Sequence, residues 1–110
     1  MIPNLALRGR AFPRAGIVAI ALAAATVTAS AADITRGASL YATHCAICHG
    51  ANGTPVLAGA PNFRRMDSLM RPDMHLLASI RSGKGAMPGF LGVLRDREIL
   101  DVVAYLRTLS

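Results

Sequence analysis

The sequence predicts a small all-α domain with three main helices. Apolar residues recur at helical spacing in three stretches, at about residues 33–46, 71–81 and 96–109. Residues 50–65, between the first two stretches, contain glycine and proline too densely for a helix or a strand. No stretch alternates apolar and polar residues as a half-buried strand does, so we expect all regular structure to be helical.

The first helix is predicted to begin near Asp33, with either Asp33 or Thr35 as the residue that caps its N-terminus. The residues that fall on one face are Ile34, Gly37, Leu40 and Tyr41. A glycine inside a helix costs about 1 kcal/mol relative to alanine. We therefore expect another backbone to pass close to Gly37.

The second and last helices are predicted from the same spacing. Pro72 suits the first helical position of the second helix, and Gly83 suits the residue just beyond its end. Its inward stripe is predicted to be Met74, Leu77 and Ile80. The stripe of the last helix is predicted to be Ile99, Val102, Val103 and Leu106.

Residues 1–31 have the composition of a secretory signal peptide. An apolar stretch from residue 17 follows a basic segment, and Ala29-Ser30-Ala31 matches a cleavage site; the basic residues are Arg8, Arg10 and Arg14. We expect cleavage after Ala31 or Ala32, which leaves a domain of residues 32–110 in the periplasm. The alternative is an uncleaved anchor, but the apolar run of 16 residues from 17 to 32 is shorter than the roughly 20 that span a bilayer.

Loss of the leader lowers the net charge. The leader holds three of the twelve basic residues and none of the six acids, so the formal charge falls from +6 to +3. A mildly positive field of this kind orients a docking partner. The remaining basic residues are scattered along the chain, so we predict no nucleic-acid partner.

Cys45-Ala46-Ile47-Cys48-His49 is the motif that carries chemistry. Two thiols three residues apart lie on one face of a helical turn, and the C-x-x-C-H pattern is typical of covalent haem attachment, with the histidine as an iron ligand. A thiol redox pair, a structural disulfide and a zinc site are the alternatives. A buried macrocycle also suits a short domain with few aromatic residues, which rarely builds a sufficient core unaided.

Five local patterns in order then give the mature chain a family resemblance. They are Gly37-x-x-x-Tyr41, Cys45 to Gly50, Ala60-Pro61-Asn62-Phe63, Gly83 to Pro88, and Val103-Ala104-Tyr105-Leu106. With them the chain resembles the small monohaem class I cytochromes c of bacteria. The resemblance implies a small cytochrome c fold, in which the first and last helices cross and the chain wraps around one covalently bound haem.

The resemblance also implies roles for individual residues. Cys45 and Cys48 would bind the haem covalently, and His49 and Met87 would be the axial ligands of its iron. Pro61 would accept a hydrogen bond from His49, and Phe63 would pack against the ring. Three other methionines compete with Met87, but Met87 alone stands among glycines and a proline, in a loop that can present its sulfur end-on; the competitors are Met66, Met70 and Met74.

Three other positions complete these expectations. His44 and His75 are expected at the surface. The family often places Ser or Thr just before the acidic start of the last helix, where this chain has Arg95. We therefore expect Asp96 to cap that helix.

An iron with two protein ligands has no open position for substrate, so we expect electron transfer and not catalysis. The leading hypothesis is a periplasmic carrier that passes single electrons between redox partners such as a dehydrogenase, a cytochrome bc-type complex, or a terminal oxidase or reductase. A bound cytochrome subunit of a larger dehydrogenase or oxidase complex is the alternative. A haem enzyme or gas sensor with an open iron is a further one. We expect no stable membrane span once the leader is removed.

Overall fold

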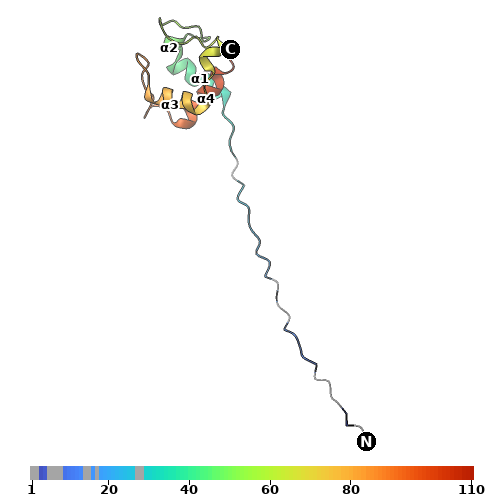
Figure 1. The fold of residues 1–110 in the computed structure, drawn as a ribbon. Helices are drawn as coiled ribbons and strands as arrows, with labels where there is room; N and C mark the ends of the chain where they lie inside the picture. Colours follow the sequence, from blue (N-terminus) through green and yellow to red (C-terminus); the bar gives the residue numbers. More distant parts are fainter. Residues whose placement is uncertain (1–2, 5–8, 14–15, 17, 27–28) are drawn as a thin grey trace.

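The computed structural model describes residues 3–4, 9–13, 16, 18–26 and 29–110. Arg8, Arg14 and Ile17 of the predicted leader lie outside these residues. The leader residues that are described have no helix or strand and are exposed, and they lead away from the helical domain (Figure 1). No helix in the described ranges is both long enough and apolar enough to cross a membrane.

The domain contains four α-helices and one 3₁₀-helix in its described residues. They are α1 (Ile34–His44), α2 (Ala46–His49), the 3₁₀-helix η1 (Met66–Leu69), α3 (Asp73–Ser82) and α4 (Asp96–Leu106). No strand occurs in the part of the chain that is described, where the only β-type pairing is an isolated bridge between Lys84 and Met87. The all-α fold is confirmed, whereas η1 was not predicted.

Helices α1 and α4 cross in close contact (Figure 1), and Gly37 lies in this contact. A Cβ atom on Gly37 would lie 2.0 Å from the backbone oxygen of Asp101 in α4. The predicted close backbone is therefore present, and a side chain at this position would push the two helices apart. One turn further along α1, the Tyr41 ring lies 5.3 Å from the Tyr105 ring between centroids, which extends the contact.

Two of the predicted helix starts differ from the structure by one position. Helix α4 begins at Asp96 with Arg95 as its N-cap residue, so the prediction that Asp96 caps the helix is wrong. The Glu98 carboxylate accepts a hydrogen bond of 2.9 Å from the backbone N–H of Arg95, which stabilises this end without a capping side chain at residue 95. Pro72 is the N-cap of α3 and not its first residue.

Helix α4 ends at Leu106, earlier than predicted. The next residue, Arg107, bonds to a distant part of the chain. Arg107 donates hydrogen bonds to the backbone oxygens of Leu69 and Arg71, each at 2.8 Å, and to the Asp73 carboxylate. Because these acceptors lie between η1 and the start of α3, Arg107 ties that stretch to the end of α4.

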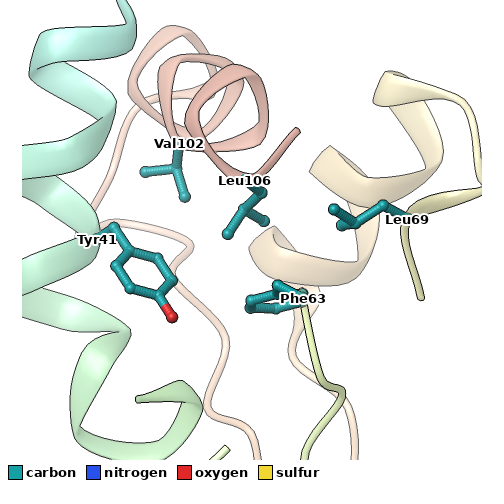
Figure 2. Close-up of a cluster of buried hydrophobic side chains, with 5 residues drawn as sticks. All are labelled: Tyr41, Phe63, Leu69, Val102 and Leu106. Carbon is teal, nitrogen blue, oxygen red and sulfur yellow. The ribbon is translucent and has the colours of Figure 1, made fainter. Parts of the chain in front are cut away.

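The buried core consists of two clusters. The first contains Tyr41, Phe63, Leu69, Val102 and Leu106, which come from α1, α4 and the chain between α2 and α3 (Figure 2). The second contains Leu77, Phe90, Leu94, Ile99 and Val103. All four residues of the predicted α4 stripe are buried.

Met74 was wrongly predicted to face the core, because its side chain is 65% exposed. Steps of three residues turn a helix by about 300°, so Met74 and Ile80 lie roughly 120° apart around α3. The buried side of α3 is instead formed by Leu76, Leu77 and Ile80, which pack against the clusters.

Gly37→Ala is expected to lower the free energy of unfolding by about 1–3 kcal/mol, because the new methyl group must displace α4. Ser39→Ala, at an exposed position of the same helix, is the matched control and should change it by less than about 0.5 kcal/mol. Denaturant unfolding of the haem-loaded proteins measures both. Equal stability of the two variants would contradict the close helix crossing.

Candidate haem-binding site

A single helical turn presents the two cysteines and the histidine. Cys45 lies at the junction of α1 and α2, and its backbone oxygen accepts hydrogen bonds from the N–H groups of Cys48 at 3.2 Å and His49 at 3.0 Å. Both cysteines are free thiols and half-buried, and burial raises the pKa of Cys45 to about 11. The turn therefore places the two thiols on one side of the backbone.

The His49 ring is buried between two parts of the following loop. Its Nδ1 lies 3.4 Å from the backbone oxygen of Pro61, somewhat longer than an ordinary N–H···O hydrogen bond. The ring stacks on Phe63 with centroids 4.5 Å apart and planes 22° apart. Burial lowers the pKa of His49, and the Pro61 oxygen partly opposes that shift. The neutral imidazole is the form that ligates a metal.

The loop after His49 is held against α1 and α2 by three hydrogen bonds. The Tyr41 hydroxyl donates to the Gly50 oxygen at 2.6 Å, and burial raises the pKa of Tyr41 to about 12. The Cys48 oxygen accepts from the N–H groups of Val56 and Leu57 at 2.9 and 3.0 Å. The chain that carries Pro61 and Phe63 is thereby folded back over the histidine.

A second loop, residues 83–90, presents Met87. Its narrow turn is closed by paired backbone hydrogen bonds between Lys84 and Met87, of 3.0 and 3.1 Å. The turn requires Gly83, whose φ of 78° is unfavourable for other residues and where a Cβ would lie 2.6 Å from a backbone nitrogen. Met87 is half-buried, whereas the side chains of its three competitors are 65–76% exposed.

An apolar cavity of about 470 Å³ lies between α2 and the loop that carries Met87. It is bordered by Cys45, Cys48, His49, Pro61 and Met87. The other bordering residues are 57–60, 84–86, His44, Ile47, Pro88 and Phe90. A smaller cavity of about 180 Å³ is bordered by Phe63 and also by Cys45, His49, Pro61 and Met87. The structure thus brings all six predicted site residues around adjoining cavities.

These residues suit a c-type haem. The larger volume falls in the range of roughly 300–1,000 Å³ that ligand pockets occupy. Two thiols can form thioethers, and imidazole and thioether are both ligands of haem iron. Lys84 adds a positive charge to the border of both cavities.

His44 is a site residue that the sequence analysis missed. It was expected at the surface, as His75 is, but it is half-buried and borders the larger cavity. Its ring meets Phe90 edge-on with centroids 5.9 Å apart. The sequence feature that could have placed His44 at the site is its position directly before Cys45, next to the turn that carries the thiols.

Comparisons with known proteins bear on the family. Residues 32–106 match the family model described as cytochrome c oxidase, cbb3-type, subunit III. The chain is 37% identical over 93 residues to cytochrome c6 of Thermosynechococcus vestitus, covering 80% of this chain and 81% of that protein. The chain belongs to the small monohaem class I cytochromes c.

A second relative and two solved structures are also c-type cytochromes. Cytochrome c6 of a Synechocystis species is 37% identical over 82 residues, covering 71% of this chain and 67% of that protein. The structure resembles the KustC0563 c-type cytochrome, with a TM-score of 0.63, 28% identity and coverage of 67% of this chain and 96% of that one. Cytochrome c6 of the diatom Phaeodactylum tricornutum gives a TM-score of 0.60 at 29% identity, covering 69% and 92%.

Membership confirms several predictions from the sequence. The fold is the small all-α cytochrome c fold, and the cofactor is one covalently bound c-type haem. The protein is an electron carrier and not an enzyme.

Proposed function

We propose that the chain is exported to the periplasm, loses residues 1–31, and works there as a carrier of single electrons between redox partner proteins. Cleavage follows Ala31 in this proposal, with Ala32 as the neighbouring site. The leader pattern supports export, and the cytochrome c6 relatives support the carrier role.

In this proposal Cys45 and Cys48 bind the haem through thioethers, and His49 and Met87 are the axial ligands of its iron. The observation that carries the assignment is that His49 and Met87 border both cavities, together with Cys45. The histidine arrives from α2 and the methionine from the 83–90 loop, so two separate parts of the chain converge on the haem site.

Pro61 and Phe63 orient the histidine. The Pro61 oxygen lies where it accepts the Nδ1 proton of His49, which leaves Nε2 as the metal-binding nitrogen. The stacked Phe63 ring keeps the imidazole from turning about its own axis. A fixed imidazole keeps the ligand geometry constant when the oxidation state changes.

Two protein ligands suit electron transfer. The bound haem supplies a one-electron couple, and a thioether ligand raises its reduction potential relative to harder ligands. If His49 and Met87 both hold the iron, neither O₂ nor a substrate would have a vacant position to bind. The chain's task is then to hold the cofactor rigidly near the surface and to dock briefly.

The redox partners are a dehydrogenase, a cytochrome bc-type complex, or a terminal oxidase or reductase. Exposed apolar side chains beside the haem cavity, such as Ile47 at 82% exposure, offer a surface for transient docking. Lys84 and the positive charge of the mature domain steer the chain toward acidic partner surfaces.

A second candidate is a permanently bound cytochrome subunit of a larger oxidoreductase complex. The matching family model, described as an oxidase subunit, favours it. The haem site would be the same, and only the lifetime of the partner contact would differ.

Met87→Ala tests the ligand assignment. Haem should stay attached, while the reduction potential falls by on the order of 0.1 V or more, because axial ligands set haem potentials across about 0.8 V. The ferrous protein should also gain CO binding. Met74→Ala, at a 65% exposed position, is the control and should change neither property. An unchanged potential and no CO binding in Met87→Ala would show that another residue is the ligand.

Size-exclusion chromatography of the native protein from periplasmic extract separates the two candidates. A free carrier elutes at the size of the single mature chain, detected by its haem absorption. Elution of most of the haem signal with a larger protein, stable in moderate salt, would favour the bound subunit.

A further inference from the structure

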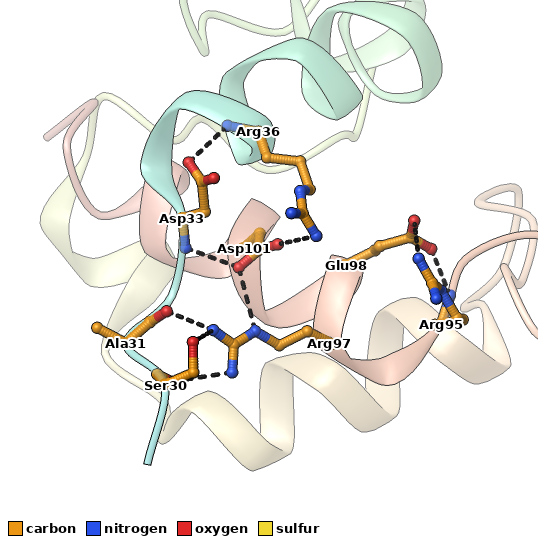
Figure 3. Close-up of polar contacts among 8 residues, drawn as sticks. All are labelled: Ser30, Ala31, Asp33, Arg36, Arg95, Arg97, Glu98 and Asp101. Carbon is orange, nitrogen blue, oxygen red and sulfur yellow. Dashed lines mark hydrogen bonds and ion pairs between the residues drawn. The ribbon is translucent and has the colours of Figure 1, made fainter. Parts of the chain in front are cut away.

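Asp101 is a residue of α4, and its carboxylate is buried against the start of α1 (Figure 3). Its side chain is fully buried. The backbone N–H of Asp33 donates a hydrogen bond of 2.7 Å to its Oδ1. Its Oδ2 is buried and has no hydrogen-bond partner among the described residues. A buried carboxylate oxygen without a donor is costly, because water no longer solvates it.

The two neighbouring arginines do not remove this cost. Arg36 approaches Oδ2 and Arg97 approaches Oδ1, each at 3.6 Å, which is beyond ordinary hydrogen-bond length. Both guanidinium side chains are about half exposed, so water screens their attraction. The Oδ2 atom therefore still lacks a donor in direct contact.

The end of the leader lies at the same place. Arg97 donates to the backbone oxygen and the hydroxyl of Ser30, at 2.8 and 2.9 Å, and to the backbone oxygen of Ala31 (Figure 3). The bond between Ala31 and Ala32 is the predicted cleavage site, and Ala32 directly precedes the residue whose N–H contacts Asp101. An ammonium created at Ala32 would thus lie one residue, within about 3.8 Å, from the Asp33 nitrogen that already donates to Asp101.

We propose that the Asp101 carboxylate is the binding site for the α-ammonium group that leader removal creates at Ala32. The proposal rests on the proposed cleavage. A leader peptidase adds water across the peptide bond, so that Ala31 gains a carboxylate and Ala32 gains an amine, which takes up the proton. The ammonium donates to Oδ2 while the Asp33 N–H keeps Oδ1, so both oxygens are satisfied.

Other charges surround this pair and set its environment. Asp33 caps α1 by accepting from the Arg36 N–H, and Glu98 is held by Arg95 (Figure 3). The positive charge of Arg36 also contributes to lowering the pKa of Glu98. Cleavage frees Arg97 from Ser30. The ammonium adds a positive charge among Asp33, Glu98 and Asp101, and it can donate directly to the Oδ2 atom that Arg36 approaches only to 3.6 Å.

The pKa of the Ala32 amine in the exported, haem-loaded ferrous protein tests the site. Mass spectrometry first establishes the N-terminal residue, and NMR follows the Ala32 Cβ shift with pH. We expect a pKa at least about one unit above the usual 7.7–8.0. Asp101→Asn should return it to that range, whereas the control Asp67→Asn, which removes an exposed carboxylate, should leave it raised.

Stability gives a second readout with a definite sign. Because the pKa is higher in the folded than in the unfolded protein, the pair stabilises the fold fully below about pH 8 and loses that effect as pH rises through the folded value. An exported variant whose mature chain begins at Thr26 moves the ammonium away but keeps Asp101. The stability of this variant should not fall in the same way as pH rises. The variant replaces Asp101→Asn as the test if Asp101→Asn does not fold.

Two results would overturn the proposal in different ways. An ordinary amine pKa on a chain that begins at Ala32 would reject the Asp101 site while leaving cleavage intact. A mature protein that retains its leader would reject both. Neither result affects the haem ligands, which the Met87→Ala variant tests separately.

Discussion

The apolar cavity between α2 and the Met87 loop is the constraint on which the rest of the structure depends. Its borders come from three separate stretches: the turn with the two thiols, the loop that ends at Phe63, and residues 84–90. A domain of this size has little core of its own, and its two buried clusters lie beside these cavities, with Met87 packed against one of them. The packing that stabilises the fold therefore also forms the haem-binding cavity.

The helix crossing and the buried polar contacts keep these borders in place. Gly37 lets α1 lie directly on α4, and Tyr41 on the same helix reaches across to the Gly50 oxygen. Phe63 contacts both Tyr41 and His49, at 6.4 and 4.5 Å between ring centroids. The histidine is thus linked to the helix crossing through an unbroken set of packed rings, which suits a site that must not rearrange on electron transfer.

Sequence patterns predicted what depends on local spacing and left out what depends on tertiary contact. The C-x-x-C-H spacing and the glycines around Met87 singled out residues that the structure brings around one cavity, because turn geometry is encoded within a few residues. Burial of Asp101 was not predictable, because an aspartate on an amphipathic helix ordinarily faces water. The exposure of Met74 and His44 was wrongly predicted for a related reason. Whether a side chain is buried depends on which distant residue packs against it, as Phe90 packs against His44.

X-ray absorption at the iron edge of the ferric native protein tests the central claim most directly, since it identifies the atoms bonded to iron without a substitution. The account predicts one sulfur neighbour and five nitrogens, four from the porphyrin and one from His49. A first coordination sphere of six nitrogens would contradict it. Another nitrogen at the cavity border would then cap the iron, with the Lys84 amine of the second loop as one candidate.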